Sequence, residues 1–371
     1  MRRQIAVILV LLFLRQGCLA QDGQTLRVGA ILPLSGGSSG EGEMARRGLE
    51  IARKRLEKLS SLKVQIDYGD SAADVKSAVS AYRNLRLQGS IPALITWGSG
   101  IGVALMPLVD QDRVVQIGIA TSTPKYRVEG DYSFRLFPSA VQEGEFNGRF
   151  AFNELHAASA AMLVMNNDYG LGLAEAFRRS FEALGGRILA TETVEASDVD
   201  FKTQILKIRT RKPELIFIAS YSGAAVSLLR QARMLALSGS ILVSSATVGD
   251  SGFLQQSGEV SDGIYVAIPG ADLRRNRDEE VRQFAHLYRQ AYNEETSPQV
   301  LMAARAHDAL MLIAFRGAQN CPRLDGECLA QKIAELRDYS GAAGTVSFDS
   351  AGDALTTFNI QRVKAGSFIP F

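Results

Sequence analysis

The stretch LIFIASYSGAAVSLLRQARML, residues 215–235, contains a short apolar run, a turn of small residues and an amphipathic pattern in succession. The run at residues 215–219 does not alternate with polar residues, which is typical of a strand covered on both faces. The amphipathic residues 224–235 indicate a helix after this strand. This order predicts one strand–turn–helix unit of a parallel sheet wound by right-handed crossovers.

The same unit recurs along most of the chain. Similar β-rich runs lie at residues 26–32, 64–68, 93–96, 114–119, 161–165, 188–194 and 241–244. Amphipathic stretches between them lie at residues 44–59, 75–87, 145–155, 173–184 and 201–210. The units form two comparable sets, at residues 26–123 and 161–254. We therefore predict an α/β fold with two doubly wound parallel-sheet lobes and a cleft between them.

The remaining segments differ from these units. Two extended segments without a helix of their own, which we expect to cross between the lobes, lie at residues 131–138 and 263–269. Helical patterns return at residues 279–292 and 299–319. The end of the chain predicts a β-hairpin around a turn at 349–353, with strands at 345–348 and 356–362.

The composition indicates a globular protein, since 46% of the 371 residues are hydrophobic and 22% are charged. Its 41 basic and 39 acidic residues leave a formal charge of +2. No basic block stands clear of acidic neighbours, so the chain lacks the electrostatic pattern of a nucleic-acid-binding protein.

The first twenty residues predict an export signal. Two arginines precede an apolar run at residues 5–14, which is too short to cross a bilayer. We expect cleavage after Ala20 and a periplasmic mature protein. Lipid attachment at Cys18 is the less favoured alternative, because Arg15 and Gln16 stand where a lipidation signal has small or apolar residues.

Cys321 and Cys328 are the only other cysteines, and they lie between two helical patterns. In an oxidising compartment this spacing predicts a local disulfide. A redox or metal pair is the alternative, but no third ligand lies nearby in the sequence. The closed loop is short, so the expected stabilisation is modest, about 2 kcal/mol.

Motifs for metal binding and nucleophilic catalysis are missing from the sequence. His156, His286 and His307 lie far apart, without an HExxH motif, and there is no GxSxG or GxxxxGK[ST]. The glycines at residues 98–102 do not complete a dinucleotide fingerprint. We therefore predict no catalytic residue, no metal and no cofactor.

Two successive turns suggest an anion site. Ser99 follows the 93–96 run at the start of a helix, where free backbone N–H groups and the helix dipole favour negative charge. The next run ends in the small, hydroxyl-bearing residues 118–124. These residues could merely cap helices, but both turns fall on the carboxyl edge of the sheet, where ligands bind. Together they favour a carboxylate or phosphate site.

The second set of units places tyrosines at the corresponding edge. Tyr169 follows the 161–165 run and Tyr221 follows the 215–219 run, each in a strand-to-helix turn. A tyrosine in such a turn is often only a rim residue, but this edge is the one expected to face the cleft.

Several short motifs occur in a characteristic order: VGAILPLSG at 28–36, GLEIA at 48–52, DYGLG at 168–172, LRQAR at 229–233 and GTVSFD at 344–349. In this order, after a signal peptide, the chain resembles the periplasmic solute-binding proteins of the branched-chain amino acid type. These proteins deliver ligand to ATP-driven importers. The resemblance covers essentially the whole mature chain.

The resemblance implies a type I periplasmic binding fold whose lobes are joined by three crossings and close over the ligand by a hinge motion. It implies a monomer with a membrane permease as partner. The crossings are expected near 135–140, 267–271 and 343–348. The expected lobes are 21–137 plus 269–345 and 138–268 plus 346–371.

In the family, the first lobe holds a carboxylate through hydroxyls and backbone N–H groups, and tyrosines of the second lobe close over the ligand. The matching first-lobe positions are Ser99, Ala120 and Ser122, with Thr121 as a neighbouring candidate. The matching tyrosines are Tyr169 and Tyr221.

The chain departs from the family after the 241–244 run, where an acid normally pairs with the ligand's amino group. The matching position is Ala246 or its neighbour, in the turn SATVG at 245–249. An ammonium without an anionic partner would be poorly compensated. Either another acid substitutes, with Asp250 and Glu41 as candidates, or the ligand lacks the amine. We expect the ligand's other end to differ from that of leucine.

The predicted function is periplasmic binding of a small carboxylate-bearing solute, an amino acid or a related organic acid, by lobe closure. The ligand would be delivered to an ABC importer. The alternative is a ligand-sensing subunit of a signalling or regulatory system with the same fold.

Overall fold

The structure is a computed structural model that describes residues 25–371 except 127, 196 and 251. The predicted export signal, the cleavage after Ala20 and Cys18 lie outside the described residues. Among the residues described, no helix combines the length and the hydropathy that crossing a bilayer requires.

Five parallel strands form the sheet of the first lobe, in the order β2-β1-β3-β4-β5. They are β1 (Thr25–Leu32), β2 (Lys63–Asp70), β3 (Ala93–Thr96), β4 (Val115–Gly118) and β5 (Ser133–Arg135). One face packs against α2 (Val75–Leu87) and α3 (Ser99–Asp112). The other face packs against α1 (Ser39–Leu59), α10 (Leu301–Met311) and α11 (Gly326–Ala334).

The second lobe repeats this order in the parallel part of its sheet, β7-β6-β8-β9-β10, and adds two antiparallel strands. The strands are β6 (Ser159–Met165), β7 (Arg187–Val194), β8 (Leu215–Ala219), β9 (Ser240–Val243), β10 (Tyr265–Pro269), β14 (Phe358–Lys364) and β15 (Ser367–Pro370). One face packs against α4 (Ala140–Asn153) and α5 (Asp168–Ala183). The other packs against α6 (Lys202–Arg211), α7 (Ser222–Met234) and α8 (Phe253–Ser257).

The remaining elements are short or peripheral. A small antiparallel sheet holds β11 (Tyr339–Gly341), β12 (Gly344–Phe348) and β13 (Ala354–Leu355), and α9 (Glu279–Tyr292) packs on α1. The short 3-10 turns are η1 (Pro124–Tyr126), η2 (Ser245–Val248), η3 (Gly258–Ser261), η4 (Pro298–Val300) and η6 (Ala318–Asn320), and η5 (Leu312–Gly317) is a π-helix that continues α10.

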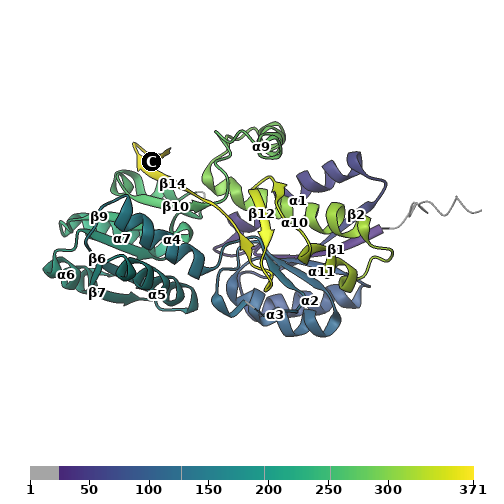
Figure 1. The fold of residues 1–371 in the computed structure, drawn as a ribbon, viewed down its shortest axis with the longest axis horizontal. Helices are drawn as coiled ribbons and strands as arrows, with labels where there is room; N and C mark the ends of the chain where they lie inside the picture. Colours follow the sequence, from purple (N-terminus) through teal and green to yellow (C-terminus); the bar gives the residue numbers. More distant parts are fainter. Residues whose placement is uncertain (1–24, 127, 196, 251) are drawn as a thin grey trace, which may run out of the picture.

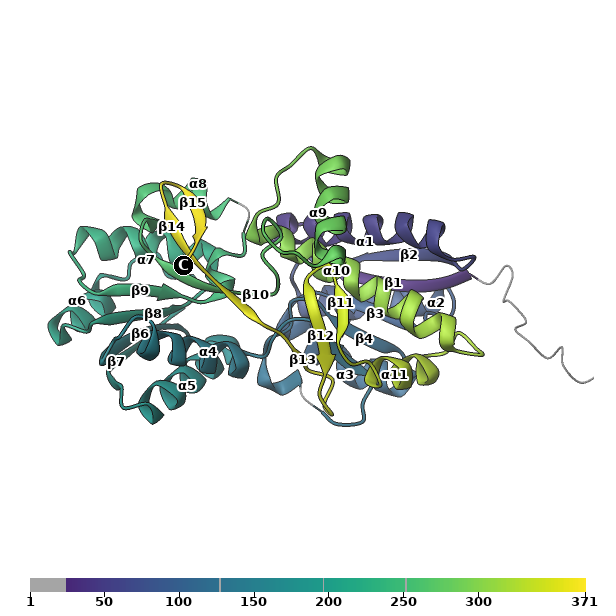
Figure 2. The same ribbon diagram turned by 45° about the horizontal axis from the view of Figure 1, so that its top comes forward.

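The two lobes lie side by side, with the carboxyl ends of both parallel sheets directed at the space between them (Figure 1, Figure 2). The predicted strand–turn–helix units are present in both lobes. In each sheet the strand order reverses at the first strand, between β1 and β3 and between β6 and β8. Ligands of doubly wound sheets bind at such reversals, so the fold itself places a site between the lobes.

Three segments of the chain connect the lobes. The first follows β5, the second follows β10, and the third joins β13 to β14. The first two agree with the expected extended segments, which contain β5, at the edge of its sheet, and β10, between β9 and β14. The third differs from its expected position.

The third crossing lies at residues 356–357 rather than near 343–348. Strand β12 pairs with β11 and β13, and its Phe348 ring packs edge-on against Phe134 of the first lobe at 5.4 Å. Asp353 also binds Arg135 at the end of β5. These contacts hold residues 346–355 in the first lobe, and we propose a lobe boundary between β13 and β14.

The predicted C-terminal hairpin is therefore only partly correct. The turn at 349–353 is present, but the strand that returns along β12 is the short β13. Strand β14 instead enters the second lobe and pairs with β10, because the buried edge of that sheet offers it a full set of backbone partners.

Helix α1 begins at Ser39, earlier than the expected residue 44, so Glu41 lies in its first turn rather than in a loop. Gly48 lets this helix approach α10 closely: a Cβ at Gly48 would lie 1.9 Å from the carbonyl oxygen of Ala303. Both helices reach the cleft, so this contact fixes two parts of the cavity wall relative to each other.

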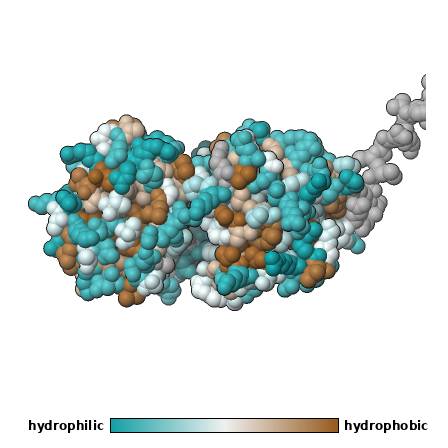
Figure 3. Space-filling model, turned by 90° about the horizontal axis from the view of Figure 1, so that it is seen from below, coloured by the Kyte–Doolittle hydropathy of each residue, from teal (hydrophilic) through white to brown (hydrophobic). Residues whose placement is uncertain are grey.

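The predicted disulfide between Cys321 and Cys328 is present, between η6 and α11. No group of three or more potential metal ligands is found within the residues that the structure covers. Hydrophilic residues cover much of both lobes on the face in Figure 3, and the surface is hollowed between them.

Candidate functional site

A cavity of about 560 Å³ lies between the lobes, within the size range of small-molecule sites. Its walls are the turns that follow β1, β3 and β4 in the first lobe and β6, β8 and β9 in the second. Its remaining wall comes from the crossings and α10, through Phe137, Ile268, Pro269, Met302 and Arg305.

Eight of the nine residues predicted to bind ligand line this cavity: Glu41, Ser99, Ala120, Ser122, Tyr169, Tyr221, Ala246 and Asp250. The exception is Thr121, which is fully buried behind the wall and donates its hydroxyl to the carbonyl of Gly98 at 3.4 Å. It packs against Gly102 and Gly118, so it supports the turn and does not face the ligand.

The predicted anion site is an open helix start. Gly98 is the N-cap of α3 and has no side chain to cap the first N–H groups of the helix. Ser99 and Ile101 in that first turn line the cavity. The Ser99 hydroxyl accepts the backbone N–H of Ser122 at 3.1 Å, which ties the turn after β4 to this helix. Uncapped N–H groups beside two hydroxyls form a suitable site for a carboxylate.

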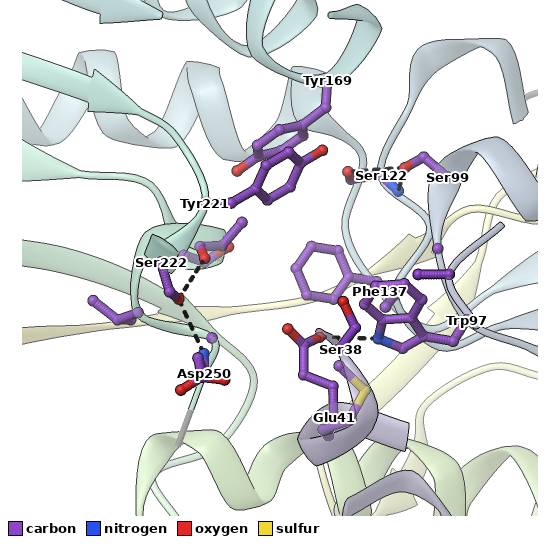
Figure 4. A pocket seen from close by; sticks show the side chains of 18 of the residues that line it. Ser38, Glu41, Trp97, Ser99, Ser122, Phe137, Tyr169, Tyr221, Ser222 and Asp250 are labelled. Atoms are coloured by element: carbon purple, nitrogen blue, oxygen red, sulfur yellow. Dashed lines mark hydrogen bonds between the residues drawn. The ribbon is translucent and has the colours of Figure 1, made fainter. Parts of the chain in front are cut away.

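The two tyrosines face this corner from the second lobe (Figure 4). Their rings stack with centroids 5.5 Å apart. The hydroxyl of Tyr169 is buried without a hydrogen-bond partner, and burial raises its pKa well above the ordinary value. The Tyr221 hydroxyl accepts a hydrogen bond from Asn167 at 3.4 Å. The Tyr169 hydroxyl lies inside its own lobe, near Ser244 and Ala246, so this residue lines the cavity with its ring.

Glu41 reaches across the cleft. Trp97 donates its indole N–H to Oε2 of Glu41 at 3.0 Å. The other oxygen lies only 4.0 Å from the position that a Cβ on Gly249 would take. The carboxylate of a first-lobe helix thus contacts the second-lobe turn from which the family's acid is missing.

Burial raises the pKa of Glu41 to about 7, with the Trp97 hydrogen bond lowering it and the charge of Asp250 raising it. Asp250 lies on the opposite wall (Figure 4). Its Oδ1 accepts the N–H of Gly252 at 2.7 Å. In the described part of the chain, neither carboxylate forms an ion pair with a basic side chain.

Sequence reasoning missed Trp97, Phe137 and Arg305. Trp97 directly follows the 93–96 run and is the single tryptophan of the chain, so its position at a strand end was a usable signal. Phe137 and Arg305 come from a crossing and from α10. Their place in the cavity depends on how distant segments pack, which local patterns do not reveal.

The model of the family described as "Periplasmic binding protein" matches residues 25–367. The chain belongs to this family. Its members bind substrates, and this periplasmic binding protein is accordingly a binding protein and not an enzyme.

Relatives of this periplasmic binding protein are distant in sequence but extend over most of its length. The leucine-, isoleucine-, valine-, threonine- and alanine-binding protein of Pseudomonas aeruginosa is 23% identical over 336 residues, 89% of this chain and 87% of its own. The crystal structure of the leucine-binding protein LivK from Thermotoga maritima has a TM-score of 0.85 at 24% identity, covering 93% of this chain and 97% of that one.

A solute-binding protein of an ABC transporter from R. palustris, in complex with benzoate, has a TM-score of 0.80 at 21% identity, covering 94% and 96% of the two chains. These similarities confirm the predicted type I fold and the resemblance to the branched-chain amino acid family.

Proposed function

We propose that this periplasmic binding protein binds a small amino acid, closes its lobes over it and delivers it to the permease of an ABC importer. The proposal includes a periplasmic location and a monomeric protein. The family and the predicted export signal support the location. The names of the relatives, which include amino acid-binding proteins and components of ABC transporters, support import over ligand sensing.

The ligand's carboxylate is assigned to the start of α3. Two kinds of donor converge there: the uncapped backbone N–H groups, and the Ser99 and Ser122 hydroxyls. Hydrogen bonds to an ionised group are stronger than those to a neutral one, so this corner favours an anionic end of the ligand.

The observation that supports an amine on the ligand is the pair Glu41 and Asp250. Two acids face the same cavity from opposite lobes, and neither has a basic partner in the described chain. An ammonium between them would offset the cost of burying the Glu41 charge and would also offset the repulsion between Glu41 and Asp250. Glu41 would then supply the charge that Ala246 lacks, from the other side of the cleft.

An organic acid without an amine is the second candidate. The turn after β9 carries no acid at Ala246, and Glu41 with a pKa of about 7 is half protonated near neutral pH. A protonated Glu41 could donate a hydrogen bond to a neutral group. The R. palustris protein in complex with benzoate supports this alternative within the same fold.

A thermal-shift and calorimetry screen of the mature chain separates the two. Each amino acid is paired with its deaminated counterpart, such as alanine with propionate and glutamate with glutarate. A ligand at 100 times its Kd should stabilise the protein by about 2.7 kcal/mol. We expect stabilisation by amino acids alone, lost in Glu41→Gln and kept in Glu43→Gln, a control on the same helix whose carboxylate binds Arg46. Stabilisation by the deaminated acids alone would establish the second candidate.

A further inference from the structure

Arg305 is a buried cation on the cavity wall, where two of the crossings meet. Its side chain is only 5% exposed. The guanidinium lies 4.7 Å from the ring centroid of Phe137, in the first crossing, and donates from Nη2 to the carbonyl oxygen of Pro269, at the start of the second. The side chain therefore contacts both crossings from the first-lobe helix α10.

No acid of the described residues makes a direct contact with this cation. The charges of Glu143 and Asp308 lie close enough to favour the charged form of Arg305, but in the described part of the chain neither acid forms an ion pair with it. Asp308 accepts the backbone N–H groups of Ala342 and Ala343 at 2.7 and 2.8 Å. Glu143 accepts the N–H of Ser245 through Oε1 at 2.6 Å, and its Oε2 is buried without a hydrogen-bond partner.

The charge persists at neutral pH, because burial lowers the pKa of Arg305 only to about 10. A buried guanidinium that forms no direct salt bridge is costly, and such groups are normally paired.

The unused donors open onto the cavity. A guanidinium has five N–H donors. Arg305 uses one of them, in its hydrogen bond to the carbonyl oxygen of Pro269. Each guanidinium nitrogen of Arg305 either has a hydrogen-bond partner or is accessible to solvent. Since Arg305 lines the cavity, its unpartnered nitrogens are accessible from the ligand space.

We propose that Arg305 binds a second carboxylate of the ligand, so that the solute is a dicarboxylic amino acid. A carboxylate matches the planar fork of a guanidinium with two parallel hydrogen bonds. A hydrocarbon side chain would leave this cation dehydrated and unpaired when the lobes close. The inference rests on the proposed function and deepens it: the α-carboxylate binds at α3, the amine at Glu41 and Asp250, and the side-chain carboxylate at Arg305.

The experiment compares L-glutamate and L-aspartate with L-norvaline, whose side chain has no polar group, by calorimetry on the mature protein. We expect the dicarboxylic amino acids to bind more tightly than norvaline. Arg305→Gln should weaken glutamate or aspartate binding by about tenfold or more, because it removes hydrogen bonds to a charged group. The affinity of Arg305→Lys for these ligands should lie between those of the unaltered protein and of Arg305→Gln, since lysine keeps the positive charge but lacks the planar guanidinium. Arg316→Gln is the matched control, an exposed arginine beyond the end of α10.

Two results would overturn this assignment. The first is that the unaltered protein binds norvaline more tightly than the dicarboxylic amino acids, a result that does not depend on whether the variants fold. An equal loss for all ligands in Arg305→Gln would show that Arg305 only holds the crossings in place. Binding of norvaline alone would leave the proposed function standing, whereas failure of every amino acid to bind would overturn both.

Discussion

Glu41 illustrates how one side chain can couple solute binding to pH. Its carboxylate is buried, hydrogen-bonded by Trp97 and close enough to Asp250 for the two charges to repel. Each of these effects changes the pKa of the carboxylate. An ammonium bound beside it would favour the ionised form, so the affinity for an amino acid is linked to the proton on Glu41.

We therefore expect the affinity for an amino acid to rise with pH. The raised pKa of about 7 means that Glu41 is mostly protonated at pH 6 and mostly ionised at pH 8. Binding should be about tenfold tighter at pH 8 than at pH 6, and level above that. Calorimetry at a series of pH values measures this, and Glu41→Gln should flatten the profile. Affinity that falls with rising pH would instead indicate that protonated Glu41 donates to a neutral ligand.

At the scale of elements, β5 and the turn before β13 are joined by a buried ion pair. Arg135 binds Asp353 with two hydrogen bonds, at 2.6 and 2.7 Å, and both side chains are almost fully buried. Arg135 also donates to the carbonyl of Thr123 at 2.8 Å. One guanidinium thus connects the turn of the anion site, the first crossing and the segment that leads into the third.

Breaking this pair should destabilise the protein strongly. Asp353→Ala leaves a buried guanidinium without its partner, and such a loss costs about 3–5 kcal/mol. Chemical denaturation of the ligand-free protein measures it. Glu327→Ala is the control, because Glu327 pairs with Arg113 at the surface and exposed pairs contribute about 0–1 kcal/mol. Similar losses in the two variants would show that the buried pair contributes no more than a surface one.

Local patterns were sufficient for the strand–turn–helix units, because a buried parallel strand needs a continuous apolar run and its turn needs small residues. They also placed Ser99, Tyr169 and Tyr221 at the correct sheet edge. They failed where pairing between distant segments decides the outcome. Strands β12 and β14 both have a local pattern of extended character, yet Phe348 of β12 packs in one lobe and β14 pairs in the other. Arg305 was missed for the same reason, since its place in the cavity depends on how α10 packs against the two crossings.

At the scale of the whole molecule, three crossings and a cavity between two lobes describe a hinge. The first lobe contributes the proposed anion site, Glu41 and Arg305 to the cavity wall, and the second lobe contributes the tyrosines and Asp250. A ligand that contacts both sets draws the lobes together, because its binding energy favours the closed arrangement over the open one.

Small-angle scattering should therefore show a smaller radius of gyration when the mature protein is saturated with its ligand. The scattering mass also reports whether the protein is a monomer, as proposed. Glu41→Gln, which should fail to bind an amino acid, serves as the control and should show no change. An unchanged radius in the unaltered protein with bound ligand would contradict closure.

The contact of Gly48 with Ala303 has a consequence for the timing of recognition. It locks α1 to α10, so Glu41 and Arg305 keep a fixed separation whatever the hinge does. With the proposed roles of Glu41 and Arg305, the first lobe alone would set the distance between the sites for the amine and the side-chain carboxylate, and so select solutes by length before closure. Asp250 and the tyrosines of the second lobe would then affect how long a solute stays bound.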